Sequence, residues 1–195
     1  TPPAAGAAAA GGGAPVSVHE KMLVLHDALA DAGIEHAFGG ALALAWCTEQ
    51  ARGTIDIDLN VFLPPEDRDP VLAALPEPIA VTAEHRSTIE RDGQVRLFWD
   101  ENPVDLFFDT TPFHEAVAER VRWEPFAGRD LPFLSCPDLA VFKVFFNRTK
   151  DWADLEAMHD AGTLDVEAVL GVVVHYLGGD DERVERLRRI APPGR

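Results

Sequence analysis

Residues 39–63 read GGALALAWCTEQARGTIDIDLNVFL, and two aspartates stand inside the apolar second half of this stretch. The run from Ile55 to Leu63 is rich in apolar and β-branched residues and stops at Pro64-Pro65, a pattern that predicts a buried strand. Side chains two apart on a strand point to the same face, about 6.5 Å from each other. We therefore expect Asp56 and Asp58 side by side, where their charges repel unless a cation or a proton neutralises them.

A glycine pair precedes this strand. Gly39 and Gly40 follow a short expected strand at 35–38 and begin an alanine- and leucine-rich helix at 41–46. Glycine lets a ligand approach the backbone closely, and the first turn of a helix offers unpaired N–H groups to phosphate oxygens. The pair predicts a place for the phosphates of a nucleotide.

A third acid repeats the pattern further along the chain. Asp105 lies between Val104 and Leu106 in the expected strand 103–109, so it is again a carboxylate within an apolar run. Carboxylates are hard oxygen ligands suited to Mg²⁺, and a third one allows a second metal about 3.5 to 4 Å from the first. Together with Asp56 and Asp58, Asp105 predicts a site for one or two Mg²⁺ ions and a nucleoside triphosphate.

The remaining patterns predict an α/β protein. Ser17 and Glu20 form a capping box that begins a helix extending to Gly33. Further helices are expected at 68–75, 112–120, 137–147, 150–159, 165–176 and 181–190, further strands at 78–84 and 94–99, and a β-rich segment at 122–135. Strands with interspersed helices first and helices last indicate a mixed sheet flanked by helices, with a C-terminal helical bundle. The expected division is a flexible Ala/Gly/Pro extension at 1–15, an α/β core at 16–134 and a helical region at 135–195.

The formal net charge of −16 argues against bulk electrostatic binding of a polyanion, so any nucleic-acid contact must be local. Two basic clusters are candidates for such a contact: Lys143, Arg148 and Lys150, and then Arg183, Arg186, Arg188 and Arg189. Solvated helix faces explain both clusters equally well.

Cysteines and histidines offer no metal-binding pattern. Cys47 and Cys136 lie far apart, which predicts two packing thiols and a reducing, cytoplasmic location. We expect His36, His85 and His114 to be packing or surface residues, because none belongs to a pair at helical spacing. No apolar run approaches 18 residues, so no transmembrane segment is expected.

The order of these motifs resembles that of the nucleotidyltransferase superfamily of the polymerase-beta type. The pattern is the pair at 39–40, RGTIDID at 52–58 and VDL at 104–106. More narrowly, FGGALALA, RGTIDID and FKVFFNRTKDWADLE at 142–156 look like the AbiEii/MenT group of bacterial nucleotidyltransferase-like toxins. The resemblance covers about residues 17–160 and implies a nucleotidyltransferase-like mixed sheet.

The resemblance also implies residue roles. Gly39 and Gly40 would face the triphosphate, Asp56, Asp58 and Asp105 would bind Mg²⁺, and Asp105 would help to deprotonate the attacking hydroxyl. Lys143 would contact the nucleotide phosphates, and Asp151 or Asp154 would be the acid of the last motif, with the choice between the two left open. A lysine that lies along an apolar helix and extends its amine to water is the competing interpretation of Lys143. Arg52 is expected either to bind phosphate or RNA, or to pair with a neighbouring acid.

The implied activity is a toxin that transfers NMP from NTP to the 3′ end of tRNA and so blocks translation. The same core would serve a small acceptor such as an aminoglycoside, which the acidity favours, or a protein hydroxyl. An inactive binding module of a larger complex is the non-enzymatic alternative. The resemblance further implies a cognate antitoxin, which would be a kinase acting on Thr54, whose hydroxyl would share the face of the aspartates if it lay on the strand. An ordinary strand threonine is the competing interpretation.

Overall fold

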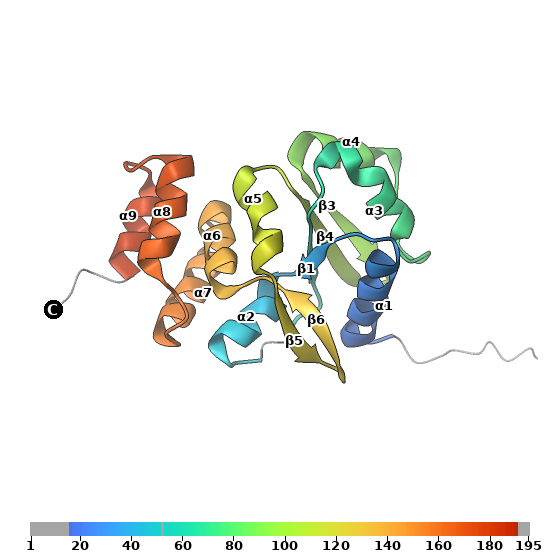
Figure 1. Cartoon of the computed structure of the whole chain (residues 1–195), viewed down its shortest axis with the longest axis horizontal. Helices are drawn as coiled ribbons and strands as arrows, with labels where there is room; N and C mark the ends of the chain where they lie inside the picture. Colours follow the sequence, from blue (N-terminus) through green and yellow to red (C-terminus); the bar gives the residue numbers. More distant parts are fainter. Residues whose placement is uncertain (1–15, 52, 191–195) are drawn as a thin grey trace, which may run out of the picture.

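Six strands form one mixed sheet in the computed structural model, which describes residues 16–51 and 53–190 (Figure 1). The strands are β1 (His36–Phe38), β2 (Ile57–Val61), β3 (Gln94–Trp99), β4 (Asn102–Phe108), β5 (Arg122–Phe126) and β6 (Arg129–Phe133). Their order in the sheet is β3-β4-β2-β1-β6-β5. Two pairs, β2 with β4 and β1 with β6, run parallel, and the other neighbours are antiparallel. The predicted mixed α/β architecture is confirmed.

Helices flank this sheet and follow it. They are α1 (Val18–Asp31), α2 (Gly40–Thr48), α3 (Arg68–Ala74), α4 (Ala83–Asp92), α5 (Pro112–Val117), α6 (Cys136–Phe146), α7 (Thr149–Asp160), α8 (Val166–Leu177) and α9 (Glu182–Ile190), with short 3₁₀ turns η1 (Pro65–Asp67) and η2 (Ala118–Arg120). In Figure 1, α6 to α9 gather at one end of the long axis, and α3 and α4 lie at the other. The capping box of Ser17 and Glu20 begins α1 as predicted.

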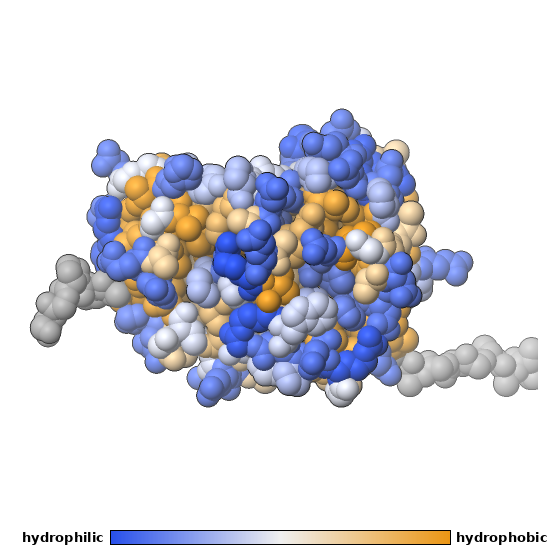
Figure 2. Space-filling model, in the orientation of Figure 1, coloured by the Kyte–Doolittle hydropathy of each residue, from blue (hydrophilic) through white to orange (hydrophobic). Residues whose placement is uncertain are grey.

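Two predictions of local structure were wrong. Residues 78–84 do not form a strand, because Thr82 and His85 form a reciprocal cap that begins α4. The helix α4 buries only Ile89, so its sequence carries little apolar periodicity, and Figure 2 shows a hydrophilic surface over it. The second strand is shorter than predicted, since β2 begins at Ile57 and Asp56 precedes it.

The central strands separate a buried face from the face that carries the acids. Ile57 and Leu59 of β2, with Val104 and Leu106 of β4, are fully buried in the core. Asp58 and Asp105 alternate with them and are only partly buried. The helices after the sheet extend the same core, with Trp152, Leu155, Met158, Val173, Val184 and Leu187 among its buried members.

A disulfide joins Cys47 at the end of α2 to Cys136 at the start of α6, with 5.7 Å between the Cα atoms. The prediction of two free packing thiols was therefore wrong, because the fold brings together residues that are far apart in the sequence. The expected reducing compartment rested on free thiols, so the disulfide removes that argument for a cytoplasmic location. No helix within the described residues is long and apolar enough to span a membrane.

Candidate active site

The parallel register of β2 and β4 sets Asp58 directly opposite Asp105. Arg96 of β3 lies opposite Asp105 on the other side, so Arg96, Asp105 and Asp58 form one row across three strands. Neighbouring strands are about 4.8 Å apart, which holds the two carboxylates close without any loop having to place them. Asp56 immediately precedes β2 and lies two residues from Asp58.

The glycine pair packs against this row. The backbone N–H of Gly39 donates to the carbonyl oxygen of Asp58 at 2.9 Å. Gly40 has a φ of +56°, and a Cβ there would lie 1.8 Å from Oδ2 of Asp58. Only glycine fits both the left-handed backbone and this close contact. The predicted neighbourhood of glycines and aspartates is thus present, and the start of α2 faces the Asp58 carboxylate.

Among the described residues, no cation forms an ion pair with Asp58. The pKa of Asp58 is raised to about 6, first by burial and then by the negative charges of Asp105 and Asp56, against a smaller opposing effect of Lys143 and Lys150. A divalent cation that enters would stabilise the charged form of a carboxyl that burial and neighbouring acids disfavour. This is the donor chemistry that a Mg²⁺ ion requires.

An ion pair between Arg96 and Asp105 keeps the predicted metal site from being fully formed. Its Nε and Nη2 bind the two carboxylate oxygens of Asp105 at 2.7 Å and 2.6 Å. Within residues 16–51 and 53–190, no group of three or more His, Cys, Asp and Glu side chains is arranged to hold a metal ion. The oxygen donors of Asp56, Asp58 and Asp105 suit Mg²⁺ chemically, but Asp105 is held by an arginine in this conformation.

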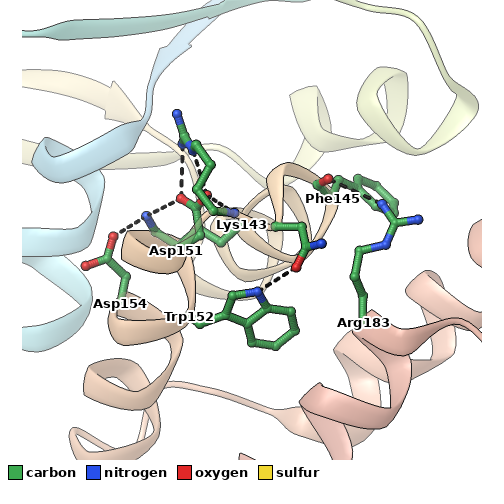
Figure 3. Close-up of polar contacts among 8 residues, drawn as sticks. Lys143, Phe145, Asp151, Trp152, Asp154 and Arg183 are labelled. Carbon is green, nitrogen blue, oxygen red and sulfur yellow. Dashed lines mark hydrogen bonds and ion pairs between the residues drawn. The ribbon is translucent and has the colours of Figure 1, made fainter.

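Lys143 lies buried between two acids of α7 (Figure 3). Its Nζ is 2.6 Å from Oδ2 of Asp154 and 3.8 Å from Oδ1 of Asp151. Asp151 is fully buried and accepts three hydrogen bonds from the backbone and guanidinium of Arg148. Lys143 is therefore not an exposed lysine that extends its amine to water, and its charge is shared with the acids of the last motif.

Several of the predicted site residues line one small cavity of about 30 Å³. The residues around it include Gly40, Asp58, Asn60, Lys143, Arg148 and Asp151. Asp151, rather than Asp154, lines this cavity. A larger groove of about 400 Å³ adjoins it, sharing Phe107, Phe146 and Arg148 with the small cavity. Asp105 and Arg96 line the groove. The small cavity has room for a water molecule, whereas the groove has the volume of a nucleotide-sized ligand.

Two arginines of this region were not among the predicted site residues. Arg96 occupies an exposed position of the alternating strand QVRLFW, and its charge on the face shared with Asp105 was the signal that could have found it. Arg148 was noted only as part of a basic cluster. It is held by Asp151 and lies over the ring of Phe146, 4.9 Å from the centroid, so it faces both cavities.

Thr54 does not lie on a strand, so the argument that it shares a strand face with Asp56 and Asp58 was wrong. Its hydroxyl instead accepts from the backbone N–H of Asp56 at 3.1 Å, within the loop that precedes β2. Asp56 is thus positioned by a local turn of the kind that threonine favours. Arg52, the other predicted residue of this loop, lies outside the described residues.

The second basic cluster, on α9, is largely engaged within the chain. Arg183 pairs with Asp181, and Arg188 pairs with Glu185. Arg186 lies over the ring of Trp152, 4.4 Å from the centroid. These contacts agree with the interpretation of the cluster as a helix face.

Solved structures with a similar course of the chain share a nucleotidyltransferase-like fold. The antibiotic-resistance factor ANT(2'')-Ia matches with a TM-score of 0.51 and 18% identity, over 88% of this chain and 89% of that chain. An antigenic nucleotidyltransferase-like protein from Paracoccidioides brasiliensis matches with a TM-score of 0.46 and 15% identity, over 89% and 95% of the two chains. At these identities the likeness concerns the fold alone. No protein-family model and no curated protein matches the sequence.

Proposed function

We propose that the protein is a Mg²⁺-dependent nucleotidyltransferase, which transfers a nucleoside monophosphate from an NTP to a hydroxyl group and releases pyrophosphate. One observation supports this above all others: Asp58 and Asp105 are register partners on adjacent parallel strands, with Gly40 in contact with Asp58. The raised pKa of Asp58 indicates a place suited to a cation. The shared fold agrees with this reaction class.

In this proposal the chain itself mainly positions the reactants and balances charge. Gly39, Gly40 and the start of α2 receive the phosphates, with Arg148 and Lys143 as the nearby cations. Asp56, Asp58 and Asp105 would hold the Mg²⁺, which would neutralise charge on the phosphates. An acceptor oxygen bonds to the α-phosphorus as the bond to the pyrophosphate oxygen breaks, and Asp105 takes the hydroxyl proton.

For the acceptor we propose the 3′ end of tRNA, in keeping with the resemblance of the motifs to the AbiEii/MenT toxins. Arg96 and Arg148 line the groove beside Asp105, and although each is paired with an aspartate, their guanidinium groups are the local cations that would contact a nucleic-acid backbone on an otherwise acidic protein. Modification of the tRNA end would block translation. A cognate antitoxin would restrain this activity.

The regulatory part of the proposal concerns Thr54. A phosphate there would add about two negative charges next to Asp56 and would compete with the nucleotide. A kinase antitoxin is the proposed partner. Mass spectrometry of the chain co-expressed with its neighbouring gene tests this, and an unmodified Thr54 together with undiminished toxicity would reject it.

A small cationic acceptor is the second candidate, and the net charge of −16 favours it. The structural neighbour ANT(2'')-Ia is an antibiotic-resistance factor of the same fold, which agrees with an aminoglycoside-like acceptor. A protein hydroxyl is another acceptor that the same transfer reaction could use. A binding module without activity is the non-enzymatic candidate, and it predicts no binding of Mg²⁺-NTP.

Transfer of label from each α-³²P-NTP separates these candidates. The purified chain is incubated with Mg²⁺ and total tRNA, an aminoglycoside or a protein extract, and the labelled product identifies the acceptor. We expect Asp56→Asn and Asp105→Asn to lower the rate about 100-fold or more, the scale of losing one transition-state contact.

The glycine turn supplies a matched pair of variants for the same assay. Gly40→Ala should abolish transfer, because its Cβ would collide with Asp58 and its backbone is left-handed. Gly53→Ala should leave transfer unchanged, because a Cβ at Gly53 meets no atom within 4 Å. Equal transfer by wild type, Asp105→Asn and Gly40→Ala would reject the proposed function.

A further inference from the structure

The pairing of Arg96 with Asp105 is the feature of the site that the proposed reaction does not use. The guanidinium contacts both carboxylate oxygens in a two-point arrangement, at 2.7 Å and 2.6 Å. Arg96 lies on β3, at the edge of the sheet, and 53% of its side chain is exposed, whereas the side chain of Asp105 is 15% exposed. The arginine can therefore leave toward solvent without disturbing the core, while the acid remains in place.

The charges in the row explain why an arginine is bound there. Asp58 and Asp105 are partly buried neighbours of like charge, and Asp56 adds a third acid nearby. Lys143 has Asp154 and Asp151 as partners, and Arg148 has Asp151. Within the part of the chain that the structure describes, Arg96 is thus the cation that forms an ion pair with one of the three predicted metal ligands. It holds the Asp105 carboxylate in position beside Asp58.

The same two-point contact leaves Asp105 unsuited to its proposed role as a metal ligand. An oxygen that already accepts a charged hydrogen bond from a guanidinium is a weaker metal ligand. A divalent cation that binds between Asp58 and Asp105 brings its own positive charge to the place beside Arg96. Repulsion between the two cations then favours release of the arginine.

We infer that Arg96 is a positioning residue that takes the place of the divalent cation on Asp105 in the metal-free protein and is displaced when the cation binds. This inference rests on the metal dependence of the proposed function. Its consequence is an order of events, because both oxygens of Asp105 can contact the cation only after Arg96 has left.

Binding of Mn²⁺, followed by electron paramagnetic resonance of the free ion, tests the competition without any turnover. Arg96→Gln should bind Mn²⁺ about fivefold more tightly than wild type, the upper end of the range expected when a partly exposed ion pair no longer has to be broken. Arg96→Lys should fall between the two, because a lysine keeps the charge but loses the two-point contact.

Two controls separate competition from general electrostatics. Arg91→Gln removes the same charge from α4, where Arg91 pairs with Asp92 at the edge of the groove, and it should bind Mn²⁺ as wild type does, within about twofold. In an Asp105→Asn background, Arg96→Gln should no longer change the affinity, because the competition requires the carboxylate.

The displacement itself can be observed by NMR. The side-chain Nε–H signal of Arg96, assigned by its absence in Arg96→Lys, should shift or broaden when Mg²⁺ saturates the protein. A signal that does not change at saturation, or an Arg96→Gln variant that binds Mn²⁺ no more tightly than wild type, would overturn the inference. If transfer of label nevertheless depends on Asp105, the proposed function stands and only the inference on Arg96 falls. If neither wild type nor Arg96→Gln binds Mn²⁺ at millimolar concentration, both the inference and the metal dependence fall.

Discussion

At the scale of single residues, Asp58 shows how the candidate site costs stability. Its pKa is raised to about 6, first by burial and then by the charges of Asp105 and Asp56. A raised folded-state pKa means that the folded protein binds the proton more tightly than the unfolded chain does. The charged carboxylate therefore destabilises the fold above pH 6, and the penalty fades as the pH falls toward 3.8.

Replacement of this one charge should reveal the cost. Asp58→Asn keeps the shape of the side chain and should raise the free energy of unfolding at pH 7 by about 1 to 3 kcal/mol, since one pKa unit corresponds to about 1.4 kcal/mol. At pH 4 the two proteins should be nearly equally stable. Urea denaturation of both proteins at the two pH values measures the difference. A variant that is less stable than wild type at pH 7 would show that Asp58 is a structural acid.

At the scale of elements, the disulfide links the two helices that frame the site. Helix α2 begins at Gly40, which contacts Asp58, and α6 carries Lys143. Cys47 and Cys136 tie these helices together across 89 residues of sequence. A covalent link over a loop of this length stabilises mainly by restricting the unfolded chain.

Reduction of the disulfide should therefore lower the stability of the protein without changing its fold. We expect a loss of about 2 to 4 kcal/mol in the free energy of unfolding on treatment with dithiothreitol, the usual range for such a link. The variant Cys47→Ser, with Cys136→Ala, should show the same loss and no further effect of the reductant. Rapid alkylation of both cysteines in the untreated, folded protein would contradict the link.

At the scale of the whole molecule, buried histidines on both sides of the sheet make the fold sensitive to acid. His36 donates from Nδ1 to the carbonyl of Ile34 at 2.8 Å, so its Nε2 accepts from Nδ1 of His26 at 2.9 Å. Burial lowers the pKa of His36 to about 4 and that of His114 also to about 4. Both histidines are neutral in the folded protein, whereas the unfolded chain gains protons below pH 6.5.

Stability should accordingly fall as the pH falls through the interval from 6.5 to 4. Each histidine should cost about 2 kcal/mol between pH 7 and pH 5, and Asp58 should offset about 1 kcal/mol of the total, because its shift has the opposite sign. Urea denaturation across this range measures the fall. In His114→Leu the fall should be smaller by the contribution of one histidine, and an identical fall in the variant would refute the assignment.

Several features of the fold and the site could be predicted from the sequence, because they depend on residues within a few positions of each other. Strand alternation gave Asp58 and Asp105 their place among buried neighbours, and a capping box set the start of α1. The glycine turn before α2 was equally readable. The helix α4 was missed because its start depends on the unusual pair of Thr82 and His85 and its face is almost entirely polar.

Contacts between distant segments were decided only by the tertiary structure. The register of β2 on β4 makes Asp58 and Asp105 neighbours, and the register of β3 brings Arg96 to Asp105. The engagement of Lys143 by Asp154 and the disulfide between α2 and α6 likewise depend on how separate helices pack. Periodicity and capping act along the chain and carry no information on which strand pairs with which. Local patterns along the chain thus identify the residues that could do chemistry, and packing of the core decides which of them meet.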